Sequence, residues 1–583
     1  MSGENSNVWT SVRRVSRRGV IRGGVVFGAG LGAALLGCSA GAPPRAAPAG
    51  GSATTAGGVA TGKPGVPVVN GTPKDGGTWT SAIPSTDVEH DMHSAASASV
   101  WHHISERALN PDPWTNEIQA NIVEKWEMPD TTHVVMHVRK GVKIHNKPPW
   151  NGRDFDADDL AFNINRIMGT TATAEGLPKA YFRRADILAG MDKIEVVDKN
   201  IVRMTLAKPS SSFMSGFVDW RMTLMPKGIV EVGFKDPMKF AGMGAFQLSE
   251  FVPDAREVFT KAPGYWRQGE PHFDKVVRTV VADGAGQIAG FISKQFDTLN
   301  VGSQQDLNTV KGARADANLY ATPGILTLYL RPHMDAPMFK DFRVRKALQL
   351  SINFQEIGEA LYGSDWGVTG PLFPGFPDAW GVDKVKTLPG INPATKAKDI
   401  ADAVKMMTAA GHDKGSGISF EIQNGPARIP QKENALRFQS QMQKLFPEMK
   451  MSVKVIGDAA AWAKVQTSKS FEMITFASNA QGTATLDATT HFHSKGGRNY
   501  GNFVNAEADA LLDKAAVTLD LKERTAILDT LQTKLQDEWM PMIMLHIETK
   551  WDFVQPNVGG FDKVSGPFGI GLPYHRLGGV YRV

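Results

Sequence analysis

The stretch that says most about this chain reads Val134-Val135-Met136-His137-Val138-Arg139-Lys140-Gly141-Val142-Lys143-Ile144-His145, and it continues shortly afterwards as Phe155-Asp156-Ala157-Asp158-Asp159-Leu160-Ala161-Phe162. Residues 133–138 predict a short β-strand because they are rich in apolar and β-branched side chains. Further along, residues 194–197 and 201–206 alternate apolar and polar side chains on either side of a polar turn. That alternation predicts a β-hairpin.

The rest of the chain mixes strand and helix patterns, which predicts an α/β fold, and it contains no internal repeat. Apolar and β-branched runs predict further strands at residues 276–281, 419–422 and 452–456. Apolar side chains at helical spacing predict helices at residues 343–361, 397–410, 505–519 and 521–538. We interpret the apolar stripes of these helices as core positions and not as a cofactor site.

The composition is that of a soluble globular protein: 42% of the residues are apolar and 21% are charged. A chain of 583 residues is too long for one compact core, and its length suggests three or four domain-sized units. The net charge is only +5, and the chain has no long run of Lys and Arg. It therefore lacks the concentrated basic face of a nucleic-acid-binding protein.

The N-terminal segment has the pattern of an export signal. Arg17 and Arg18 form a twin-arginine pair, and an apolar, Gly- and Ala-rich stretch follows at residues 23–37. This stretch is shorter than the roughly 20 residues of a membrane-spanning helix, so a spanning anchor is the weaker alternative. It closes with Leu35-Leu36-Gly37-Cys38, which resembles a bacterial lipobox.

Cys38 is the only cysteine of the chain, so the fold cannot depend on disulfide bonds. The resemblance to a twin-arginine-exported lipoprotein implies that residues 1–38 form the signal peptide and that Cys38 accepts the lipid. Residues 39–75 are mainly Gly, Ala, Pro, Ser and Thr, which predicts a flexible tether. The expected location is therefore extracytoplasmic, with the protein attached to the membrane through Cys38.

Several segments, taken in their order along the chain, resemble the peptide/nickel/opine class of family-5 extracellular solute-binding proteins, the binding components of ABC importers. Besides the stretch quoted first, the segments that carry the resemblance are residues 76–79, 122–127, 244–248, 263–267, 342–348 with Asn353, and 499–503 with Asn505. The resemblance covers about residues 76–555.

The resemblance implies a type II periplasmic-binding-protein fold of cluster C, with two lobes and an extra subdomain inserted in the first lobe. It implies that lobe 1 comprises residues 76–90, 210–325 and 545–583, that the insert comprises residues 91–209, and that lobe 2 comprises residues 326–544. A ligand that touches both lobes favours the closed state, which then docks on an ABC permease. The family expectation is a monomer that binds a small molecule or peptide without a cofactor.

The resemblance also points to candidate ligand-binding residues. In peptide-binding members an Asp that follows a Trp in the second lobe pairs with the amino terminus of the peptide, whereas this chain has Ser478 and Gln481 at the matching positions. A neutral amide cannot neutralise a buried ammonium group, so the departure argues against ordinary free-amine peptides unless Asp487 takes that role. Ser478, Asn479 and Gln481 suit a polar, uncharged ligand. Trp366 and Trp220 are the candidate aromatic walls, and packing in the apolar core is the alternative for each.

Residue patterns bear on three alternatives. His491 and His493 have a spacing that could place both imidazoles on one face of a strand, but no third ligand lies close by in the sequence, so we predict no metal site. A secreted hydrolase is disfavoured because the common nucleophile and metal-hydrolase motifs are missing. A sensor that presents its ligand to a signalling partner remains open. The expected function is ligand capture and delivery, without catalysis.

Overall fold

The structure is a computed structural model that describes residues 66–94, 99–178, 181–182, 185–188, 190–363, 367–425, 429–480, 482–566, 568 and 576–583. These residues belong to the compact unit Gly62–Val583. The predicted signal peptide with Cys38, most of the predicted tether, and the candidate site residues Trp366 and Gln481 lie outside the described residues.

A ten-stranded mixed sheet organises the fold. In spatial order its strands are β14 (Lys450–Val455), β13 (Ser419–Asn424), β15 (Met473–Asn479), β12 (Asn318–Pro332), β16 (Ile543–Val554), β11 (Thr298–Val301), β1 (Thr78–Ile83), β10 (Lys275–Val280), β9 (Arg256–Lys261) and β8 (Phe246–Val252). The pairs β1–β10 and β13–β14 are parallel, whereas β12 pairs with β16 in an antiparallel arrangement.

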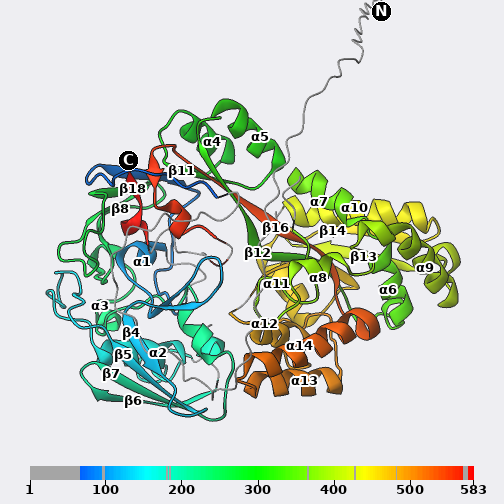
Figure 1. Cartoon of the computed structure of the whole chain (residues 1–583), viewed down its shortest axis with the longest axis horizontal. Helices are drawn as coiled ribbons and strands as arrows, with labels where there is room; N and C mark the ends of the chain where they lie inside the picture. The colour runs from blue at the N-terminus through cyan, green and yellow to red at the C-terminus, as the bar shows by residue number, and fades with distance from the viewer. Residues whose placement is uncertain are drawn as a thin grey trace, which may run out of the picture. The chain divides into compact units, whose positions relative to one another are not determined.

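The two long central strands, β12 and β16, connect the halves of this sheet. Figure 1 shows them running between the elements that surround β1 and β8 and the helices that surround β13 and β14. Their register shifts between Pro323 and Thr327, where three residues of β12 lie opposite one residue of β16. Gly324 occupies this bulge because a Cβ atom there would lie 2.7 Å from the carbonyl oxygen of Glu548. The bulge therefore depends on a residue without a side chain.

A separate four-stranded sheet contains the hairpin predicted from the sequence. Its order is β4 (Val123–Glu127), β5 (His133–Val138), β7 (Ile201–Leu206) and β6 (Met191–Asp198), and helix α2 (Ala157–Ile167) packs against it. Asp156 caps α2, and the Asp159 carboxylate accepts two hydrogen bonds from Arg153, at 2.6 and 2.7 Å. The acidic residues of the stretch quoted first thus fix the start of this helix.

Apolar side chains form separate cores in the two halves. The first core draws on residues 79–276 and 554–580, together with Tyr320. Two further cores draw on residues 325–547 and Phe568, and they fill the spaces between the β13–β16 half of the sheet and its helices. The helices of this half are α6 (Phe342–Ser351), α7 (Phe354–Tyr362), α8 (Val382–Lys386), α9 (Lys396–Ala409), α10 (Ile429–Leu445), α11 (Ala459–Ser468), α12 (Ala484–Phe492), α13 (Ala506–Val517) and α14 (Leu521–Lys534).

Most of the predicted elements are confirmed within a few residues, but the helix predicted over residues 343–361 is wrong. The structure has two helices there, α6 and α7, because the chain is extended at Ile352. Asn353 then caps α7 by accepting a hydrogen bond from the backbone N–H of Glu356, at 3.1 Å. The segment predicted as one helix over residues 521–538 is α-helical only in its first part. Helix α14 ends at Lys534, and residues Leu535–Trp539 form a π-helical turn.

Buried histidines make a pH dependence of stability predictable. Burial lowers the pKa of His93 and His102 to about 3, and that of His145 and His546 to about 4. The unfolded chain binds protons at these side chains below about pH 6.5 while the folded chain does not, so stability is lost as the pH falls through this window.

We therefore expect each of these histidines to lower the free energy of unfolding by up to about 1.4 kcal/mol per pH unit between about pH 6.5 and pH 4.5. Urea unfolding followed at about pH 7 and pH 5 measures the slope. A His546→Gln variant keeps a side chain able to donate to the Asn434 amide oxygen, which lies 3.0 Å from His546 Nε2, and should show a flatter profile. Stability that stayed level or rose on acidification would contradict this prediction.

Candidate ligand-binding site

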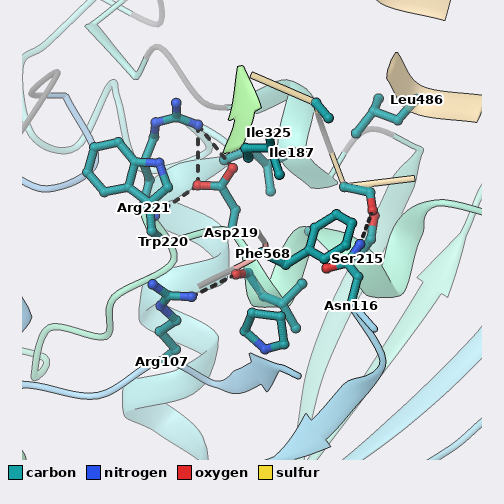
Figure 2. A pocket seen from close by; sticks show the side chains of 15 residues that line it. Arg107, Asn116, Ile187, Ser215, Asp219, Trp220, Arg221, Ile325, Leu486 and Phe568 are labelled. Carbon is teal, nitrogen blue, oxygen red and sulfur yellow. Dashed lines mark hydrogen bonds and ion pairs between the residues drawn. The ribbon is translucent and has the colours of Figure 1, made fainter. Parts of the chain in front are cut away.

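A cavity of about 100 Å³ lies between the two halves of the molecule. Ten of its described lining residues come from residues 107–221, four come from the other half at Ile325 and residues 480–486, and Phe568 completes the wall. Figure 2 shows side chains from the two halves around the same space. A cavity that both halves line responds to their relative movement.

One wall of the cavity belongs to the half that contains the first apolar core. Its polar part consists of Asp219, Trp220 and Arg221. Both carboxylate oxygens of Asp219 accept hydrogen bonds from Arg221 Nη1, at 3.3 and 3.0 Å, and Oδ1 also accepts from the Arg221 backbone N–H at 2.8 Å. The Arg221 guanidinium lies over the Trp220 ring, 4.6 Å from its centroid. His102 contacts Trp220 edge-on, with ring centroids 5.3 Å apart, so the indole is held in one orientation.

Arg107 is the second cationic side chain of this wall. It follows α1 (Ser99–Ile104), is 1% exposed, and donates a hydrogen bond from Nη1 to the Val218 carbonyl oxygen at 3.1 Å. Burial lowers its pKa to about 10, although the carboxylates of Asp219 and Glu106 act in the opposite direction. The guanidinium is therefore charged at neutral pH but has given up much of its hydration.

The opposite wall depends on the bulge in β12. The bulge places Ile325 at the cavity, and the Ile325 carbonyl oxygen accepts a hydrogen bond from the backbone N–H of Ala480 at 2.8 Å. Leu486, in the first turn of α12, adds a second apolar side chain. Thr483 caps this helix by accepting a hydrogen bond from the backbone N–H of Leu486 at 3.2 Å.

Direct polar contacts join the two walls. Asn116 Nδ2 donates to the carbonyl oxygen of Gly482 at 2.8 Å, and the hydroxyls of Ser212 and Thr483 lie 2.7 Å apart. Nearby, the backbone N–H of Ser211 donates to the Ala516 carbonyl at 2.8 Å. These contacts hold the segments on both sides of the cavity close together.

The candidate residues predicted from the sequence lie in different places. Trp220 lines the cavity. Ser478 is buried outside the lining, where its hydroxyl oxygen accepts a hydrogen bond from Arg498 and lies 3.2 Å from His491 Nε2. Asn479 is exposed at the end of β15 and pairs with Leu326 in the sheet. Asp487, the alternative acidic residue, lies 4.0 Å from His491 Nε2.

Sequence reasoning missed Arg107, Asp219 and Arg221, which carry the charges of the wall. No motif marks them: Arg107 is separated from Asp219 and Arg221 by more than a hundred residues. Asp219 and Arg221 flank the aromatic candidate Trp220 in the sequence, which is the one local signal for them, and Arg107 has no such signal.

The two histidines considered as metal ligands have different partners. His491 is buried against Tyr329 and Arg331, with its Nδ1 lying 3.0 Å from Arg331 Nη2. His493 Nδ1 lies 3.8 Å from Asp509. Within the described residues, no three His, Cys, Asp or Glu side chains are grouped so that they could hold a metal ion.

No helix within the described part of the chain combines the length and the apolar character needed to cross a membrane.

Comparison with known proteins places the chain in a family. Residues 117–501 match the family described as bacterial extracellular solute-binding proteins, family 5. The dipeptide-binding protein of Escherichia coli (strain K12) is 24% identical over 488 residues, which cover 80% of this chain and 87% of that protein. Heme-binding protein A of Haemophilus influenzae is 23% identical over 510 residues, which cover 84% of this chain and 89% of that protein.

The solved structures agree with the predicted fold class. A putative peptide-binding protein AppA from Clostridium difficile superposes with a TM-score of 0.73 at 18% identity, covering 87% of this chain and all of that one. The mixed sheet and its two long central strands are thus those of a type II periplasmic-binding-protein fold. Because the family match spans residues 117–501, more than half of the chain, this protein is a member of the family-5 bacterial extracellular solute-binding proteins.

Proposed function

We propose that this protein is an extracytoplasmic lipoprotein that captures a small polar solute, oligopeptide-like or other, between two closing lobes and delivers it to an ABC importer. The observation that carries the proposal is the cavity lined by Trp220 and Arg221 from one half and by Ile325 and Leu486 from the other. A ligand that contacts both walls binds the closed arrangement better than the open one and shifts the population towards it. Binding, without catalysis, is then the whole task of the site.

The proposed lobes follow the bounds expected from the sequence: residues 76–90, 210–325 and 545–583 for lobe 1, residues 91–209 for its inserted subdomain, and residues 326–544 for lobe 2. The separate apolar cores support the division between the two lobes but not a separate insert, because one core draws on residues of both lobe 1 and the insert. The bulge at Gly324, where the paired strands β12 and β16 lose regular register, is the proposed hinge. A residue without a Cβ suits a hinge because it tolerates larger changes in φ and ψ.

The ligand can be identified directly. We expect native mass spectrometry of the purified protein to show a bound small molecule that is released on denaturation. The closed arrangement buries such a ligand between two walls, which slows its loss during purification. An empty protein that is also not stabilised against heat by any member of a panel of sugars, amides, opines, short peptides and nickel chelates would argue against solute capture.

Membrane attachment has its own test. We expect a Cys38→Ser variant to be exported and released in soluble form, because the serine hydroxyl cannot replace the thiol that accepts the lipid. The unmodified chain should sediment with membranes. Fractionation with immunoblotting measures the difference, and a Ser39→Ala variant is the matched control that should stay with the membrane. Retention of the Cys38→Ser variant in the membrane fraction would point to an uncleaved apolar anchor.

A further inference from the structure

The cavity is small for a ligand site that two halves of a molecule line. Its volume is about 100 Å³. Pockets that enclose drug-sized ligands typically measure about 300–1,000 Å³. A closed cavity of about 150 Å³ holds a molecule as small as benzene. The cavity between the halves therefore has room for a ligand of at most roughly ten non-hydrogen atoms, which is the size of one amino acid.

Hydrogen bonds join the two halves directly at the edge of this cavity. In each of them a residue between positions 116 and 212 contacts a residue between positions 482 and 516. We call them the closing contacts, and they are Asn116 Nδ2 to the Gly482 carbonyl oxygen at 2.8 Å, the hydroxyls of Ser212 and Thr483 at 2.7 Å, and the Ser211 backbone N–H to the Ala516 carbonyl oxygen at 2.8 Å. Asn116 and Gly482 also line the cavity, and Figure 2 draws their contact as a dashed line beside Ser215.

The backbone holds both partners of the first closing contact in place. Asn116 has a φ angle of +61° and Gly482 has one of +51°, in the left-handed region that Asn and Gly tolerate best. The Asn116 backbone N–H donates to the Asp112 carbonyl oxygen at 3.0 Å, in the turn between β2 (Leu109–Pro111) and β3 (Ile118–Ala120). This turn therefore presents the Asn116 amide in one position, independently of the other half.

The cavity cannot widen by a small movement of its walls. A Cβ atom at Gly216 would lie 2.4 Å from the Ile187 carbonyl oxygen, and one at Gly482 would lie 2.8 Å from Ser215 Oγ. The wall segments are thus already in close contact with their neighbours, and packed segments resist compression. A larger ligand must instead push the two halves apart, and that separation breaks the closing contacts.

The lining favours a ligand with a polar end and a small apolar part. Asn116, Asp219 and Arg221 place polar groups on one wall, whereas Ile325 and Leu486 place apolar side chains on the opposite wall. A few polar groups fix the orientation of a ligand in such a site, and apolar side chains enclose the rest of it. A single amino acid or its amide combines polar groups and one side chain in this way.

We propose that the ligand is a compact polar solute of about the size of one amino acid, and that the closing contacts exclude longer chains. This inference rests on the proposed solute-binding function and adds the size class of the solute. A ligand that fits inside the cavity lets the halves form the closing contacts, which add to its affinity. A longer chain projects between the halves and loses those contacts, so it binds a more open arrangement.

Titration calorimetry with two series of probes tests the size limit. One series is N-acetyl-alanine amide with its two- and four-alanine homologues, which are uncharged, and the other is alanine, dialanine and tetra-alanine, which carry both terminal charges. In whichever series binds, we expect the one-residue probe to bind at least about 10-fold more tightly than the four-residue probe, because the longer probe loses several hydrogen bonds. Equal or tighter binding of the four-residue probe would overturn the inference, and so would failure of all the probes to bind at millimolar concentration.

A Ser212→Ala variant removes one closing contact. The Ser212 hydroxyl does not cap the short 3-10 helix Phe213–Val218 that it precedes, so this helix should be unaffected. We expect the variant to bind the one-residue probe about 3- to 10-fold more weakly and the four-residue probe as before. Ser468→Ala is the matched control and should change neither affinity, because Ser468 is exposed and its hydroxyl donates to the Lys464 carbonyl oxygen within helix α11. An equal loss for both probes, or a loss for neither, would overturn the role of the closing contacts.

The mass of the molecule that co-purifies with the protein separates this inference from the proposed function. A molecule below about 200 Da would support both, since this mass corresponds to the size that the cavity holds. A larger molecule, such as a tetrapeptide, would overturn the size class and leave solute capture intact.

Discussion

Replacement of Arg166 by leucine is expected to lower the free energy of unfolding by about 3–5 kcal/mol. Arg166 is 1% exposed in its side chain and donates two hydrogen bonds of 2.7 Å to Asp91. It also pairs with Glu175 at 2.9 Å and lies over the rings of Phe182 and Phe234. The leucine variant would leave two buried carboxylates without their cation, and this penalty far exceeds the loss of packing.

Urea or guanidinium unfolding at neutral pH measures the effect. An Arg203→Leu variant is the control, because this exposed arginine on β7 should change the stability by no more than about 0.5 kcal/mol. A decrease in the free energy of unfolding of less than about 1 kcal/mol for Arg166→Leu would contradict this prediction. It would mean that water reaches Asp91 and Glu175 and that these carboxylates do not form a buried ionic cluster with Arg166.

The second large effect is expected at Gly482, where a side chain would occupy the cavity. A Cβ atom there would lie 2.8 Å from Ser215 Oγ and 3.3 Å from Leu486 Cδ2. A Gly482→Leu variant should therefore weaken binding of the co-purified ligand by up to about 100-fold, since forcing extra methylene groups into a packed space typically costs 1–3 kcal/mol. Calorimetry with the isolated ligand measures the loss.

Two controls separate the loss of binding from damage to the fold. Gly482 has a φ angle of +51°, so leucine also brings backbone strain of about 1–2 kcal/mol, which unfolding measurements report separately. Gly497 is exposed, and a Cβ atom there would have no neighbour within 4 Å, so Gly497→Leu should bind the ligand normally. Unchanged affinity in a folded Gly482→Leu variant would place the ligand outside this cavity.

Local patterns determined much of the secondary structure. The hairpin of β6 and β7 follows from alternating side chains around a polar turn, and α9 and α13 follow from apolar spacing bounded by Gly411 and Asn505. The split between α6 and α7 was missed because apolar spacing continues through residues 351–354. The break depends on the extended backbone at Ile352 and on the Asn353 cap, which periodicity does not reveal.

The fold class and the family could be predicted from local patterns and from the order of motifs along the chain, and the same patterns marked Trp220 as a candidate residue that the structure places at the cavity. The other lining residues come together only through tertiary contacts. Arg107, Arg221 and Ile325 meet at one cavity only because β12 and β16 pair across the middle of the sheet with a bulge at Gly324. Contacts between segments so far apart in the chain leave no periodic signal, so residue patterns do not reveal which side chains share the cavity.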